Sequence, residues 1–208
     1  MSLITSFRTR EVRWFLKEPF HKADRWFEKL PSSSCTLESR EDIYLVLPGR
    51  NDLGVKFRES RLELKYRLEE SGPQEIAPGI TGTFESWEKL GFPSDPESMA
   101  SALPVDSRAS RMPVLKRRRA TIIGTKGTTE TFHPLGTPVE AGVQFEYTEL
   151  QVFGSSWLTV GLEWSDAAGV TLPERFLSGL LSSEVFKVSS SMGYPEFLRR
   201  MLRQKEGF

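Results

Sequence analysis

Cysteine and histidine are scarce in this chain of 208 residues, and neither sign of charge is in excess. The single cysteine, Cys35, excludes an internal disulfide and a cysteine-based zinc site, and it favours a cytoplasmic location. The two histidines, His21 and His133, lie far apart in the sequence. A histidine metal site or a Ser-His catalytic relay therefore has little support.

The charge balance and the short apolar runs exclude further classes. Lys plus Arg and Asp plus Glu each number 28, so a positive patch must come from the placement of charges. This balance argues against a nucleic-acid partner, because such proteins usually carry a basic excess. No stretch approaches the roughly 18 apolar residues that cross a bilayer, and the first residues lack the apolar core of a secretory signal. We expect a soluble protein with no membrane partner.

A regular alternation of apolar and charged residues is present between Leu53 and Glu70. It predicts a hairpin with arms at 55–58 and 61–68, since successive side chains leave opposite faces of a strand. One face of the two arms then carries four cations, Lys56, Arg58, Lys65 and Arg67. Taken alone, such a face is more often the solvated side of a half-buried sheet. An anion site is the alternative.

The remaining patterns predict further strands and several helices. The predicted strands are 11–20 (stopped at Pro19), 43–47, 113–124, 143–153 and 157–164; the predicted helices are 22–30, 84–92, and two near the C-terminus that begin at Pro173 and Tyr194. Residues 71–82 are predicted to be a Gly/Pro-rich loop, and 93–111 an inserted helical lid or a flexible loop. Residues 125–138 are predicted to be a polar loop or a ragged hairpin.

About seven strands, mostly adjacent in sequence and linked by hairpins, predict the α+β class. The expected architecture is an antiparallel sheet or barrel with helices packed outside and at the C-terminus. The length is compatible with one domain that spans residues 1–208. The C-terminal helix is amphipathic and would dock on the barrel or on a second subunit, which leaves a homodimer open.

Several short motifs occur in an order that resembles a known family. A glutamate lies on the first strand, a K/R-x-R arm precedes an L-x-L-K-x-R arm, and a segment ends in LGF. A strand with K-x-R, two late acidic strands and a Y-P-E-F-L helix follow. From about Glu11 to Leu202 the chain resembles a CYTH domain, the fold of triphosphate tunnel metalloenzymes.

The resemblance implies an eight-stranded antiparallel tunnel that binds a triphosphate through basic side chains. The matching phosphate-binding positions are Lys56, Arg58, Lys65, Arg67, Lys116 and Arg118, and Arg13 is predicted to join them as a cation that the family does not have at that position. Guanidinium groups can bind phosphate oxygens in bidentate fashion, while lysine serves as a point charge. Lys116 and Arg118 belong to a run of four basic residues, so at least two of that run must face solvent.

The chain departs from the family's E-x-E-x-K motif. Glu11 keeps the first position, but Arg13 and Phe15 replace the second glutamate and the lysine. On the late strand Thr159 and Gly161 stand where carboxylates are expected, which leaves Glu163. A divalent Mg²⁺ or Mn²⁺ ion would then be held by Glu11 with Glu163, or with Glu146 or Glu149 from the neighbouring strand.

Three functional hypotheses follow. The first is a module that binds a triphosphate- or polyphosphate-containing anion, with metal-dependent catalysis weak or lost and with Arg13 supplying the fixed positive charge. The alternative is an active metal-dependent hydrolase of inorganic, nucleoside or thiamine triphosphate. The second alternative is a nucleic-acid or protein interaction module. The sequence does not identify the ligand or the catalytic residues.

Overall fold

A computed structural model describes residues 4–94, 109–126, 129–139, 142–165 and 171–207. Its strands are β1 (Thr5–Leu16), β2 (Thr36–Val46), β3 (Leu53–Arg58), β4 (Arg61–Ala77), β5 (Ile80–Pro93), β6 (Ser110–Lys126), β7 (Thr129–His133), β8 (Gly142–Val152) and β9 (Ser155–Ser165). The described helices are α1 (His21–Glu28), α3 (Glu174–Leu180) and α4 (Tyr194–Glu206), besides two short 3₁₀ turns. None of these helices has the length and apolar character needed to span a membrane.

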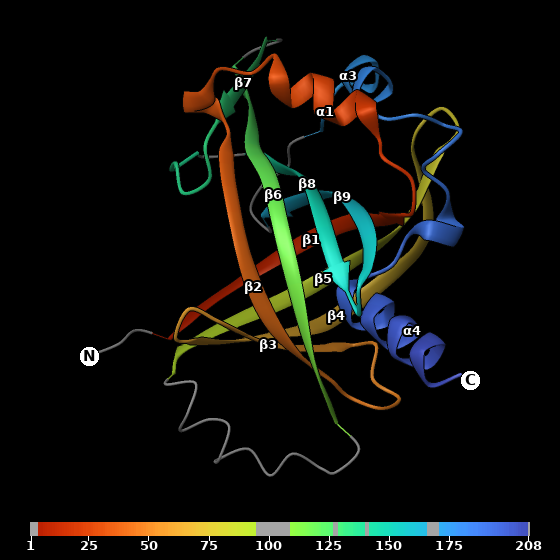
Figure 1. Cartoon of the computed structure of the whole chain (residues 1–208). Coiled ribbons are helices and arrows are strands. Elements are labelled where there is room, and N and C mark those ends of the chain that lie inside the picture. Colours follow the sequence, from red (N-terminus) through yellow and green to blue (C-terminus); the bar gives the residue numbers. More distant parts are fainter. Residues whose placement is uncertain (1–3, 95–108, 127–128, 140–141, 166–170, 208) are drawn as a thin grey trace.

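Eight of the strands close into an antiparallel barrel (Figure 1). The order is β2-β3-β4-β5-β1-β9-β8-β6, and β6 pairs with β2 to complete the ring. That closing pair runs from Thr36 opposite Ala120 to Val46 opposite Ser110. The strand β7 extends the sheet beside β6 and confirms the hairpin alternative for this region. The predicted antiparallel barrel with outer and C-terminal helices is therefore confirmed.

Side-chain alternation divides each strand between an outer apolar core and the barrel interior. On β1, Val12 and Trp14 are fully buried in the outer core. The helices α1 and α3 cover this core, and the ring of Phe27 stacks on Phe145 at 5.1 Å. Burial of these large side chains stabilises the packing of the helices on the outer surface of the barrel. Glu11 and Arg13, which alternate with them, face inward.

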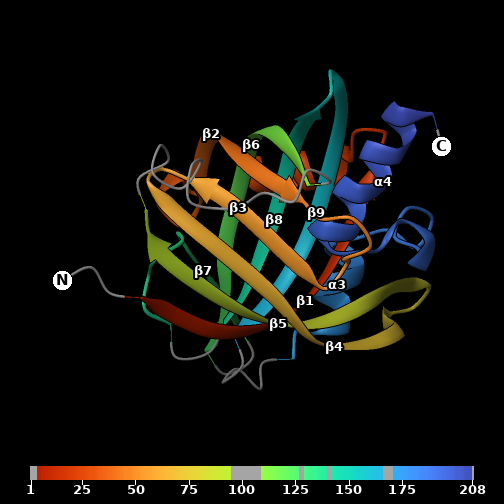
Figure 2. The ribbon, with the colours of Figure 1, turned by 90° about the horizontal axis from the view of Figure 1, so that it is seen from below.

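The C-terminal helix α4 packs against one end of the barrel (Figures 1 and 2). Pro195 stands in its first turn, where the missing N–H removes no helical hydrogen bond. Phe197, at helical spacing from Met201, stacks on the ring of Phe15 at 3.9 Å. Trp157 also packs on Phe197 and lies in this apolar cluster. Of the two positions predicted for this amphipathic helix, on the barrel or on a second subunit, the structure shows α4 docked on the barrel.

Two predictions for the segment between residues 71 and 92 are wrong. The predicted loop 71–82 and the predicted helix 84–92 are parts of the long strands β4 and β5, which turn at Gly79. The strand β5 pairs with β4 on one side and β1 on the other, so its backbone hydrogen bonds are satisfied within the sheet. Gly82 allows the close approach, because a Cβ there would lie 2.5 Å from a methyl group of Val12. Tertiary pairing overrides the local helical pattern.

For the other strands and helices, the predicted and observed boundaries differ by fewer residues or only at one end. The first strand begins earlier and ends at Leu16, and β2 begins seven residues before the predicted Ile43. The strand β6, the pair β8 and β9, helix α1 and the two C-terminal helices lie where they were predicted. Of the predicted lid at 93–111, residues 95–108 lie outside the described residues, and Ser110 and Arg111 belong to β6.

Candidate functional site

The barrel encloses a cavity of about 420 Å³. Nine basic side chains and four glutamates line it, and they come from all eight strands of the barrel. The basic residues are Arg13, Arg40, Lys56, Arg58, Arg61, Lys65, Lys89, Lys116 and Arg118; the glutamates are Glu11, Glu63, Glu146 and Glu163. The interior therefore carries a positive excess, although the whole chain is neutral.

Six of the seven predicted phosphate-binding residues line this cavity, and so do Glu11 and Glu163. The exception is Arg67, whose guanidinium binds Glu85 and Glu70, each at 2.6 Å. Arg117, from the same basic run as Lys116, is exposed on the outer face beside Glu149. Arg119 is half-buried there and binds Asp24 of α1. Only one of the four consecutive basic residues is thus fully exposed.

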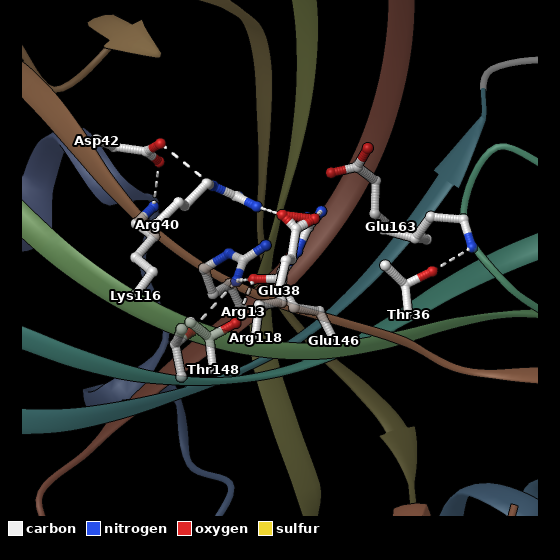
Figure 3. Close-up of polar contacts among 12 residues, drawn as sticks. Arg13, Thr36, Glu38, Arg40, Asp42, Lys116, Arg118, Glu146, Thr148 and Glu163 are labelled. Atoms are coloured by element: carbon white, nitrogen blue, oxygen red, sulfur yellow. Dashed lines mark hydrogen bonds and ion pairs between the residues drawn. The ribbon is translucent and has the colours of Figure 1, made fainter. Parts of the chain in front are cut away.

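Four cations surround the carboxylate of Asp42, which is completely buried. Its oxygens lie 2.9 Å from Arg58 Nε, 3.0 Å from Lys116 Nζ, 3.2 Å from Arg40 Nε and 3.8 Å from Lys56 Nζ. Figure 3 shows Asp42 with Arg40 and Lys116. We call these five residues the Asp42 cluster. Burial favours the neutral carboxyl, but Lys116, Lys56 and Arg58 outweigh it and hold the pKa of Asp42 far below its usual range.

One carboxylate cannot neutralise four cations, and the lysines of the Asp42 cluster show this. Burial lowers the pKa of Lys56 to about 8 in spite of the attraction of Asp42. Burial likewise lowers the pKa of Lys116 well below its ordinary value. Further negative charge in the cavity would stabilise both ammonium groups. Glu63 also binds Lys56 at 2.8 Å and Glu38 binds Arg40, so three carboxylates face these four cations and one positive charge remains in excess.

Arg13 is held rigidly in the barrel interior. Its Nη1 donates to Glu146 Oε1 at 2.8 Å and to Thr159 Oγ1 at 3.3 Å, and Arg118 donates to the other oxygen of Glu146 at 3.1 Å. Gly161 lies opposite Arg13 on β9, and a Cβ there would be 2.9 Å from the guanidinium carbon. Burial alone lowers the pKa of Arg13, but Glu146 and Glu11 raise it above its ordinary value. Arg13 is a permanent cation in a space that Gly161 leaves free.

Three glutamates stand in a row across neighbouring strands. Glu11 on β1 lies directly opposite Glu85 on β5 and Glu163 on β9. Each of the three glutamates forms an ion pair with a cation. Lys65 Nζ lies 2.6 Å from Glu11, Lys89 Nζ lies 2.5 Å from Glu163, and Arg67 Nη1 lies 2.6 Å from Glu85. Burial favours the neutral carboxyl of Glu11, but Lys65, Arg13 and Lys89 lower its pKa to about 2.

This row does not fit a resident Mg²⁺ or Mn²⁺ ion. The ammonium groups of Lys65 and Lys89 lie 2.6 Å from Glu11 and 2.5 Å from Glu163, so they occupy the side of each carboxylate that a bound metal ion would need. Among the described residues, no group of three or more histidine, cysteine, aspartate or glutamate side chains has a geometry that could hold a metal ion. The arrangement suits internal ion pairs instead.

Glu85 makes the stability of the barrel depend on pH. Burial, together with Glu11, raises its pKa to about 7. Between the unfolded-state pKa of ~4.3 and this value the folded protein binds more protons, so the free energy of unfolding falls by about 4 kcal/mol as pH rises through that range. We expect Glu85→Gln to remove this part of the decline. Urea unfolding at pH 4.5, 6 and 8 measures it.

The control for Glu85 is Glu149→Gln, which changes a half-exposed carboxylate on the outer face. It should leave the pH dependence of unfolding as in the parent protein. An unchanged slope between pH 4.5 and 7 in Glu85→Gln would show that Glu85 does not carry the proton.

The structure adds cavity residues that the sequence patterns did not single out. Arg40 and Tyr44 line the cavity and the buried Asp42 alternates with them on β2, but the predicted strand began only at Ile43. Lys89 was hidden in the predicted helix 84–92. Period-two alternation was the available signal in both segments.

A comparison with protein-family models finds none that matches this chain, and a comparison with curated proteins finds no similar sequence. What the structure shares with the expected fold is the closed eight-stranded antiparallel barrel, and no family is identified by these comparisons. The interior chemistry carries the functional argument.

Proposed function

We propose that the protein binds a triphosphate- or polyphosphate-containing anion inside the barrel, with metal-dependent catalysis weak or lost. The observation that carries this proposal is the Asp42 cluster, in which one buried carboxylate faces four cations. A bound anion would supply the missing negative charge. The walls of the barrel strengthen such contacts, because they act at a lower effective dielectric than on an open surface.

The distribution of the cations favours an extended anion over a single small one. Basic side chains line the cavity from β1, β2, β3, β4, β5 and β6, so cations face it from most of the barrel wall. A polyphosphate carries charge on each phosphate group and can meet several of these cations at once. Arginine and lysine are both present, which suits forked and single contacts to phosphate oxygens.

Arg13 supports binding without a metal ion. It places a fixed charge at the second position of the acidic motif and binds Glu146, a carboxylate that a metal would otherwise need. Lys65 and Lys89 similarly bind Glu11 and Glu163. Cations of the protein would then do the charge neutralisation that Mg²⁺ performs in phosphoryl-transfer enzymes.

One observation favours the alternative of a metal-dependent triphosphatase. Glu11 and Glu163 stand directly opposite each other and both line the cavity. That alternative requires Lys65 and Lys89 to leave these carboxylates when substrate enters.

The enclosed cavity argues against the nucleic-acid alternative, because it suits an anion of the size of a polyphosphate better than a nucleic-acid duplex.

Calorimetric titration with tripolyphosphate, with and without Mg²⁺ or Mn²⁺, tests the proposal when released phosphate is assayed in the same samples. We expect binding in the absence of metal, no phosphate release, and affinity that falls with added salt. Binding that needs metal and is followed by turnover would favour the triphosphatase. No binding under either condition would refute the proposal.

A further inference from the structure

Side chains fill the barrel interior at the end where α4 packs. The filling residues are at most 8% exposed and comprise Phe15, Val46, Met112, Val152, Phe197 and Met201. Beside Pro195 and Leu198 there is a separate crevice of only about 10 Å³. That is room for about one water molecule. Nothing larger can leave the cavity through this apolar plug as it stands.

The first residues of α4 also form the inner wall of the cavity. Tyr194 and Pro195 both line it. The ring of Tyr194 stacks on Tyr44 at 5.7 Å, and Lys116 Nζ lies 4.0 Å from the Tyr194 centroid. Pro195 approaches the backbone of β3, since a Cβ on Gly54 would lie 3.3 Å from it. The helix therefore closes the cavity as well as packing on the barrel.

Among the described residues, none closes the opposite end of the cavity as α4 closes the first. That end is lined by Thr5 and Phe7 at the start of β1, and the Phe7 side chain is 52% exposed. The cations that line the cavity also differ in the exposed fraction of their side chains. The side chain of Lys116 is 4% exposed and that of Arg13 is 5%, whereas Arg58 is 21% and Lys89 is 22% exposed. A ligand thus meets the outer cations first and the buried ones last.

We propose that the cavity is blind, that the ligand enters end-first through the Phe7 mouth, and that the protein selects anions with a free terminal phosphate. This inference rests on the proposed function and names its ligand class. A terminal phosphate carries up to two negative charges and three free oxygens, whereas an internal phosphate carries one charge and two free oxygens. The terminal group matches the inner end of the cavity, where the Lys116 ammonium is 4% exposed, 3.0 Å from Asp42 and 4.0 Å from the ring centroid of Tyr194.

Three ligands with matched chemistry test this selection on the unmodified protein. Tripolyphosphate has two free ends, adenosine triphosphate has one, and diadenosine tetraphosphate has none while carrying a charge similar to that of adenosine triphosphate. We expect the first two to bind and the doubly capped compound to bind roughly tenfold or more weakly. Equal affinities for the two nucleotides would overturn end-first entry and leave the proposed function standing. If tripolyphosphate itself fails to bind, both proposals fall.

Lys116→Ala separates recognition of the end from general attraction. It should weaken binding of tripolyphosphate and adenosine triphosphate by roughly tenfold, and it should leave diadenosine tetraphosphate nearly unchanged. Arg117→Ala, the neighbouring position on the outer face of β6, is the matched control and should change none of the three affinities. An equal loss for all three ligands in Lys116→Ala would contradict a terminal-phosphate site at the buried end.

Discussion

Replacing Lys56 and Arg58 together by alanine should lower the affinity for tripolyphosphate by about 100-fold or more. Both side chains point from β3 into the cavity and belong to the Asp42 cluster. A hydrogen bond to a charged group contributes about 1.5–3 kcal/mol, so the loss of two exceeds the roughly 2.7 kcal/mol of a hundredfold change. Asp42 keeps Arg40 and Lys116 as partners, which preserves its ion pairing.

Calorimetry at low salt measures the affinity of this double variant, and thermal unfolding checks that it is folded. The control is Arg117→Ala with Arg200→Ala, which removes the same charge from side chains that are 64% and 52% exposed outside the barrel. Equal affinity in the parent and in the Lys56/Arg58 variant would exclude the cavity as the binding site.

Asp42→Asn should destabilise the ligand-free protein by about 3–5 kcal/mol, because it leaves buried cations without their counter-charge. The carboxylate is fully buried, and its oxygens receive hydrogen bonds from Arg58 at 2.9 Å and 3.2 Å. Tripolyphosphate should restore stability to this variant by more than it stabilises the parent protein. Binding only to the folded state adds about 2.7 kcal/mol at a ligand concentration of 100 Kd.

Denaturant unfolding with and without tripolyphosphate measures both effects. Asp52→Asn provides the control, since Asp52 pairs with Arg50 at the surface and its loss should matter little. Stability unchanged by Asp42→Asn would show that the four cations do not depend on this carboxylate. An equal gain from ligand in variant and parent would show that the ligand does not reach the Asp42 cluster.

The internal ion pairs suggest how the empty barrel tolerates so much charge. Carboxylates of the barrel bind the cations before a ligand arrives, as Glu63 does with Lys56 at 2.8 Å and Glu11 with Lys65 at 2.6 Å. A phosphate chain would exchange these partners instead of meeting bare charges. This pre-organises the side chains and lowers the ordering cost of binding.

The sequence by itself determined the hairpins and the faces of their strands. Alternation at 55–68 and 143–164 is a property of neighbouring residues, because the side-chain direction reverses at each position of a strand. It therefore predicted that Lys56, Arg58 and Lys65 share one face. It also predicted an antiparallel barrel with helices outside.

Only the tertiary structure decided what that face encloses. The closing pair of β2 with β6 joins segments far apart in the chain, and it brings Lys116 to Asp42. Pairing of β5 on both sides made a strand of residues with a helical pattern and turned Lys89 inward. The packing of α4 determined which end of the barrel is filled by apolar side chains. Local patterns cannot specify these features, since each depends on contacts between residues that are distant in sequence and on the apolar surface that those contacts bury.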